Sequence, residues 1–294
     1  MRSFTRSFVL KLSAAPFILA AALSAAPASA QNFDRISTSL TDTLQTAVDM
    51  LPEGVTNVRL GLGPVIAPDY EGSNNYNIDA VPAISLRYRN LIEVDNNEVK
   101  VIAFRRLLTS GTDASGGSIR VGPLVRIDFG RSAGDSPDLK GMGNVGTSLE
   151  LGAFVAYTTA GGARIRLRAR HDVVSGHGGG LVSADYAQPF IRTERFVLSG
   201  TVAGTWTTGK YMRSFFGVTP VQAAASGYPV FTPGSGFKDI NGGLNALYQI
   251  SPQWSVVADA NYKRLLGGAA DSPIVRIAGS PNQMAYSAFV VYSF

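Results

Sequence analysis

The side chains that could carry chemistry are few, and the two histidines stand close together. The chain has 294 residues with 2 His and no Cys. Between His171 and His177 lie Asp172 and Ser175, residue types from which a hydrolase or metal site can be built. All four fall on one strand end and one Gly-rich segment, and no third group is specifically placed to orient a base. We therefore expect no catalytic residue, no metal and no cofactor, and a flexible outer loop at 176–180.

The absence of Cys narrows the function classes further. It excludes a disulfide framework, zinc fingers, iron–sulfur clusters and thiol catalysis. The Gly-rich run 176–180 also lacks the Lys-Ser/Thr ending and the following helix of a phosphate-binding loop. The sequence therefore predicts a protein that is not an enzyme.

A stripe of arginines occupies every second position of one segment. These residues are Arg164, Arg166, Arg168 and Arg170, and the residues between them are apolar. An arginine that faced lipid near the membrane midplane would cost about 2–4 kcal/mol, so this stripe must face a lumen or water. A stripe of one sign can select anions in a pore. Alternatively, inward carboxylates can pair with it as an internal charge ladder, which we favour; the candidates are Glu150, Asp185 and Asp259.

The elements that must position this stripe are β-strands. After residue 54 the chain alternates between apolar and polar residues in segments of about ten, separated by Gly, Pro, Asn, Asp and Ser. In 254–264 the apolar face begins at Trp254 and includes Tyr262, which places these rings roughly 20 Å apart along the membrane normal, close to two aromatic girdles. The chain ends in an alternating strand closed by Tyr292 and Phe294. This ending resembles the signal that the outer-membrane barrel assembly machinery reads.

Composition and the first 30 residues agree with a membrane location. Residues 1–30 have a basic start, an apolar Ala-rich stretch and a small-x-small site, so they predict a signal peptide cleaved between Ala30 and Gln31. Removing its three basic residues leaves 23 Lys and Arg against 21 Asp and Glu. The small positive net charge that remains does not indicate a nucleic-acid-binding surface. We expect the outer membrane of a Gram-negative bacterium, with contacts to lipid and lipopolysaccharide.

One helix is expected before the strands, within a separate unit at 31–54. Apolar residues recur there at helical spacing: Ile36, Leu40, Leu44, Val48 and Leu51. A 16-residue amphipathic helix is marginal alone and needs a surface for its apolar stripe. Three roles remain open: a plug in a barrel, a periplasmic arm that docks a partner, or a weakly ordered leader.

The strands of 55–294 predict an all-β fold, a transmembrane antiparallel β-barrel of about 12 strands. Outer-membrane barrels have even strand numbers, short periplasmic turns and long outer loops. Tight turns at 160–162, 193–194 and 251–253 fit the periplasmic side, whereas 211–237 and 267–283 fit the outer side. The count is twelve if 91–106 forms a short hairpin, and ten otherwise.

Several stretches, in order, resemble one family. They are GLGPVIAPDYEGS at 61–73, Pro82, Gly130-Arg131, LKGMGNV at 139–145 leading into LELGAF at 149–154, GHGG at 176–179, FGVT at 216–219, the turn at 248–254, and 266–275 with Asp271-Ser-Pro273. Over 58–294 the chain resembles the MltA-interacting protein (MipA/OmpV) family of Gram-negative outer-membrane proteins. The helix at 36–51 is not part of that pattern.

The resemblance implies a scaffold without a catalytic motif. The member that gives the family its name is similar to an adaptor that brings a lytic transglycosylase together with a peptidoglycan synthase. We therefore expect a non-catalytic scaffold linking the outer membrane to peptidoglycan-remodelling enzymes. The alternatives are a narrow diffusion channel for small anionic solutes and a surface-exposed adhesin acting through the loops at 211–237 and 267–283.

Overall fold

The computed structural model describes residues 56–108 and 116–294. The expected signal peptide and the expected helix at 36–51 lie outside these described residues. Within them, no helix is long and apolar enough to cross a membrane.

Most of the described chain is strand. The strands are β1 (Asn57–Pro68), β2 (Tyr76–Tyr88), β3 (Ile92–Asp95), β4 (Glu98–Val101), β5 (Phe104–Leu107), β6 (Ser118–Asp128), β7 (Ser148–Thr158), β8 (Arg164–Asp172), β9 (Gly180–Arg192), β10 (Phe196–Thr207), β11 (Gly236–Gln249), β12 (Trp254–Leu265) and β13 (Asn282–Ser293). All pairings between them are antiparallel, as expected for strands joined by turns.

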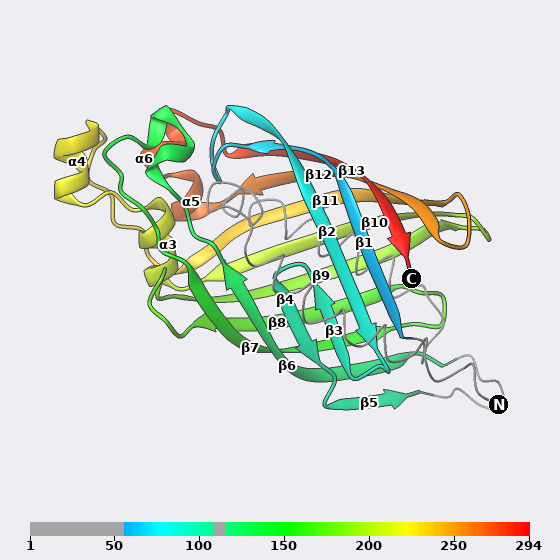
Figure 1. Cartoon of the computed structure of the whole chain (residues 1–294). Helices are drawn as coiled ribbons and strands as arrows, with labels where there is room; N and C mark the ends of the chain where they lie inside the picture. Colours follow the sequence, from blue (N-terminus) through cyan, green and yellow to red (C-terminus); the bar gives the residue numbers. More distant parts are fainter. Residues whose placement is uncertain (1–55, 109–115) are drawn as a thin grey trace, which may run out of the picture.

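Twelve of these strands close into a barrel (Figure 1). The ring is closed where the last strand pairs with the first, with Leu60 opposite Tyr292. On the other side β4 skips β5 and pairs with β6, with Glu98 opposite Arg126. The extra strand, β5, pairs with a further part of β6. The predicted twelve-stranded barrel and the short hairpin within 91–106 are thus confirmed.

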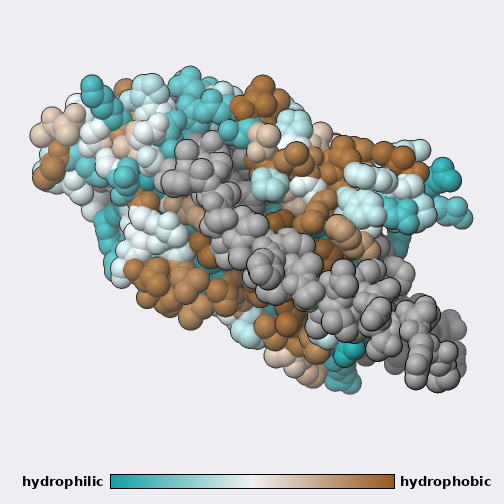
Figure 2. Space-filling model, viewed as in Figure 1, coloured by the Kyte–Doolittle hydropathy of each residue, from teal (hydrophilic) through white to brown (hydrophobic). Residues whose placement is uncertain are grey.

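Alternation along each strand decides which side chains face out. On β12, Val257 is 2% exposed and faces inward, whereas Trp254 and Tyr262 on the same strand are exposed on the outer face. The same outer face carries Tyr292 beside Trp254, with ring centroids 4.9 Å apart. In Figure 2 hydrophobic residues gather over the barrel wall, and hydrophilic residues are frequent at its two ends. This apolar outer belt is what a barrel needs to lie in lipid.

The two ends of the barrel differ. One end has tight turns, such as the turn in which Thr193 N–H donates to Phe196 O over 2.8 Å. The other end has longer connections that contain the short helices, grouped together in Figure 1: η1 (Ala133–Asp135), η2 (Pro137–Leu139), α3 (Gly209–Phe216), α4 (Pro220–Ser226), α5 (Gly267–Ala270) and α6 (Pro273–Arg276). By the loop-length rule, the turn end is periplasmic and the helical end is the outer end.

The inner surface has two distinct walls. One wall, on β3, β4 and β6 to β9, carries buried charged side chains. The other, on β1, β2, β12 and β13, carries a strip of buried apolar residues, here called the apolar strip: Val65, Ala67, Val81, Ala83, Val257, Phe289 and Val291. Barrel interiors are ordinarily polar, so the apolar strip is the unusual surface.

Candidate functional site

The arginine stripe of β8 lies on the charged inner wall. Its four arginines are 0–9% exposed, and the apolar residues between them, such as Ile165 at 56%, face outward. Asp185 on β9 lies opposite Arg166 in the antiparallel pairing, and Arg166 Nε donates to Asp185 Oδ1 over 2.8 Å. The same carboxylate lies 3.7 Å from Arg164 and 3.5 Å from Arg168. One aspartate therefore forms ion pairs with three of the four arginines.

A second carboxylate in this wall, Glu98, is one that the sequence analysis did not single out. Glu98 on β4 is fully buried and lies 3.7 Å from Arg168 and 3.4 Å from Arg170. Lys100 on the same strand lies 3.8 Å from Glu98 and donates to Asp95 over 3.0 Å. The signal in the sequence was the alternation of charge along 93–100, but sequence cannot show that β4 faces β8 inside the barrel.

These contacts join into one network. Among the described residues it connects eight basic side chains, Arg87, Lys100, Arg120, Arg126, Arg164, Arg166, Arg168 and Arg170, with five carboxylates, Glu93, Asp95, Glu98, Glu150 and Asp185. Buried charges this close persist only because each is paired.

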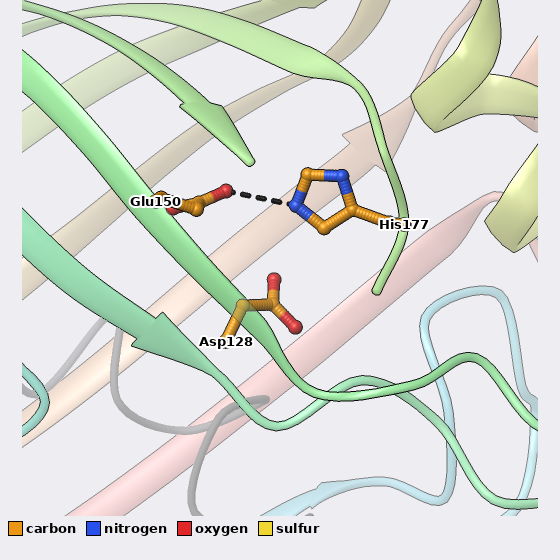
Figure 3. Close-up of side chains that lie close together, drawn as sticks. All are labelled: Asp128, Glu150 and His177. Atoms are coloured by element: carbon orange, nitrogen blue, oxygen red, sulfur yellow. Dashed lines mark hydrogen bonds and ion pairs between the residues drawn. The ribbon is translucent and has the colours of Figure 1, made fainter. Parts of the chain in front are cut away.

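Glu150, His177 and Asp128 meet at the outer end of this wall (Figure 3). Their ligand-type atoms lie within 4.8 Å of one another, a spacing that suits a metal. However, Gly179 N–H donates to His177 Nδ1 over 3.0 Å, so the imidazole proton sits on Nε2 and is donated to Glu150 over 3.1 Å. A metal on Nε2 would leave the ring with no proton, and Arg170 already lies 3.4 Å from Glu150. The geometry favours a hydrogen-bonded ion cluster.

The remaining sequence candidates are dispersed. Asp259 is buried on β12, four strands from β8 around the ring. His171 is exposed on the outer face of β8, and His177 points inward. Tyr292 and Phe294 lie at the periplasmic end, where Phe294 N–H donates to Val58 O over 2.9 Å.

The outer end is covered by an apolar cluster built from four loops, here called the lid. The loop residues pack together with Leu181 and Leu265 at strand ends; the cluster comprises Tyr70, Leu139, Met142, Val145, Leu181, Tyr211, Met212, Phe215, Phe216, Val218, Leu265, Ala269, Ile274 and Val275. Hydrogen bonds cross between the loops: Ser272 Oγ donates to Phe216 O over 2.6 Å, and Tyr70 Oη donates to Ile274 O over 3.0 Å. The loops thus form a packed cover.

The Gly-rich segment 176–180 is part of this cover, so the expectation of a flexible outer loop there is wrong. His177 is 2% exposed and stands edge-on to the Tyr211 ring of α3, with centroids 4.9 Å apart. A Cβ on Gly179 would lie 2.4 Å from the backbone nitrogen of Tyr211. The glycines are needed because they let the α3 backbone approach this closely.

A charged contact ties the lid to the barrel. Lys238 Nζ donates to Glu71 Oε1 and Oε2 over 2.6 and 2.9 Å, and Lys263 Nζ donates to the same carboxylate over 3.0 Å. Burial alone would raise the pKa of Glu71, but the two lysine charges outweigh it and lower the pKa to about 2. In α3, burial raises the pKa of the Tyr211 phenol well above its usual value.

Described residues line one cavity toward each end of the barrel. The outer cavity, of about 120 Å³, lies beneath the lid between Arg126, Lys238 and Lys263. The periplasmic cavity, of about 300 Å³, is lined by Asn57, Arg59 and the turns at 192–195 and 251–254. Both are rich in basic groups, so each favours an anionic occupant over a cationic one.

A sequence model of the family described as MltA-interacting protein MipA matches residues 60–294. A search of curated proteins gave no match.

Three solved barrels resemble the chain at low identity. The NanC porin is 14% identical, with 81% of this chain and 99% of that chain covered and a TM-score of 0.42. The translocator domain of the autotransporter NalP from Neisseria meningitidis is 12% identical, with 91% and 97% covered and a TM-score of 0.40. OprB from Pseudomonas putida is 8% identical, with 86% and 96% covered and a TM-score of 0.41.

Proposed function

Because the chain belongs to the MltA-interacting protein MipA family, we propose that it is a non-catalytic scaffold that binds a lytic transglycosylase at its periplasmic end. The closed barrel with its apolar outer belt is an outer-membrane β-barrel. On this proposal the barrel anchors peptidoglycan-remodelling enzymes, among them a peptidoglycan synthase, to the outer membrane. Lipid and lipopolysaccharide surround it, and the barrel assembly machinery inserts it by its C-terminal strand.

The observation that carries the proposal is the lid. Four loops pack into one apolar core over the outer end, with Phe216, Ile274 and Val275 0% exposed. Below it, paired charges occupy one side of the lumen. A barrel covered on the outside and hollow at its periplasmic mouth is better suited to presenting a surface to the periplasm than to passing solutes.

A second candidate function is a narrow channel for small anions. The basic side chains that line the outer and the periplasmic cavities favour it. The adhesin alternative has less support, because the loops at 208–235 and 266–281 pack against each other rather than projecting.

The direct test is binding between the refolded, mature full-length barrel and a purified lytic transglycosylase. Substituting Arg195 and Glu194 in the periplasmic turn should weaken binding, whereas Val221→Ser on the outer helix α4, where Val221 is 79% exposed, should leave it unchanged. Equal loss with both variants, or no binding by the parent protein, would contradict the scaffold function.

A further inference from the structure

The periplasmic cavity contains a buried arginine that has no partner in the described part of the chain. Arg59 lies on β1 at an inward position, in the same alternation as Val65, and it lines the cavity. The residue is 8% exposed, and its guanidinium forms no hydrogen bond and no ion pair with another described residue. A guanidinium has five N–H donors and stays charged in proteins. Arg59 therefore presents a positive charge to the cavity.

The charged groups near Arg59 do not compensate this charge. On the neighbouring strand β2, Arg87 adds a charge of the same sign. The carboxylates of β3 have other partners: Glu93 lies 3.6 Å from Arg87, and Asp95 accepts a hydrogen bond from Lys100 over 3.0 Å. Burying a charge without a counter-charge is costly, and a bound anion offsets that cost. The position of Arg59 therefore suits a ligand that brings a negative charge.

The rest of the cavity lining supplies neutral hydrogen-bonding groups. Four amide or hydroxyl side chains line it: Asn57, Gln249, Ser255 and Ser293. In the part of the chain that the structure describes, none of these four side chains makes a hydrogen bond, so their donors and acceptors are available to a ligand. Val197 and Leu247 add an apolar patch. Such a mixture of apolar surface and a few polar groups is typical of small-molecule sites.

Size and charge together narrow the class of ligand. The volume of about 300 Å³ is at the lower end of the range for small-molecule sites. One buried guanidinium balances a single negative charge and binds a carboxylate through two parallel hydrogen bonds. A phosphate monoester carries between one and two charges at neutral pH and would exceed that balance. Arg195 and Glu194 on the adjoining turn are exposed and of opposite sign, so water and salt screen them.

We propose that the periplasmic cavity binds a sugar acid of about one ring. Arg59 holds the carboxylate of the ligand, and the amide and hydroxyl side chains of the lining hydrogen-bond to the sugar hydroxyls. This goes beyond the scaffold function, because it assigns the barrel a small-molecule ligand that no partner protein has to supply.

Calorimetric titration of the refolded, mature full-length barrel tests the site. The probes are galacturonate, neutral galactose of nearly the same shape, and galactose 6-phosphate. The variants are Arg59→Gln and Arg59→Lys, which keeps the charge but loses the planar fork. The control is Arg264→Gln, an exposed arginine at the outer end of β12 that donates to Asn282. Compact migration on unheated gels checks that each variant is folded.

The parent protein should bind galacturonate more tightly than either of the other two probes. Arg59→Gln should weaken galacturonate binding by about ten- to a hundred-fold, the contribution of hydrogen bonds to a charged group. Arg59→Lys should fall between the parent and Arg59→Gln, and Arg264→Gln should bind like the parent. Galactose binding should be weak and should not change with Arg59.

Four results would overturn the site: no binding of galacturonate, equal binding of galactose, tighter binding of the phosphate ester, or no effect of Arg59→Gln in folded protein. Stability gives a second check. Because Arg59→Gln removes a buried charge without a described partner, it should not lower the denaturant midpoint of the ligand-free barrel. A fall as large as that of Asp185→Asn would assign Arg59 to the structure instead. None of these outcomes depends on whether a transglycosylase binds.

Discussion

At the scale of single residues, the barrel interior is organised by shared carboxylates. Asp185 contacts three arginines and Glu98 contacts two arginines and a lysine. Such sharing makes each carboxylate more important than any one of its partners. Removing one takes a counter-charge away from several buried cations at once, whereas removing one arginine leaves the carboxylate with its other partners.

We predict that Asp185→Asn lowers the free energy of unfolding by about 3–5 kcal/mol, because it removes a carboxylate that contacts three buried arginines of β8. The measurement is denaturant unfolding of the refolded barrel followed by tryptophan fluorescence. Tyr186→Phe, one residue along on the outer face, removes only the hydrogen bond to Gln188 and is the matched control. A loss for Asp185→Asn no larger than the control would show that the stripe needs no counter-charge.

The Glu71 contact predicts a dependence of stability on pH. The pKa of Glu71 is lowered to about 2 from its usual 4.5, so its contribution is complete above about pH 4.5 and is lost as the pH falls to about 2. The stability difference between wild type and Glu71→Gln should therefore shrink across this window. Unfolding at several pH values measures it, and a difference that is constant from pH 6 to 2 would contradict the pairing with Lys238 and Lys263.

At the scale of elements, the strands were predictable and the lid was not. Period-two alternation directly reports which side chains share a face, so the strands and the outward Trp254 and Tyr262 follow from sequence. The partner of Arg168, Glu98, lies 70 residues earlier and meets it across the lumen, which no local pattern encodes. The sequence contains one indication of the lid. Two pairs of apolar residues, Tyr211-Met212 and Phe215-Phe216, stand one helical turn apart within a segment expected to be a surface loop.

For the lid, we predict that Phe216→Ala weakens the packing of the outer loops by about 3–5 kcal/mol, because the ring is 0% exposed in the apolar cluster. The loop 208–235 should then be cleaved faster by protease added from the outer side. Val221→Ala on the exposed face of α4 is the control. Equal cleavage of both variants would mean that the lid is not held by its core.

At the scale of the whole molecule, the two ends of the barrel differ in structure. The outer end is covered by packed loops, one inner wall is filled with paired charges, and the opposite wall offers an apolar surface. In the described part of the chain, the periplasmic end combines short turns with a cavity of about 300 Å³. This asymmetry is why we propose a periplasm-facing scaffold rather than a pore.

Single-channel recording of the refolded mature protein in planar bilayers tests this account most directly. A barrel closed by its lid and charge network should give no discrete conductance steps. Lid disruption by Phe216→Ala should at most add brief, flickering openings. Stable steps from the unmodified protein, reversing at an anion-selective potential, would contradict the closed scaffold and establish the arginine-lined lumen as a channel.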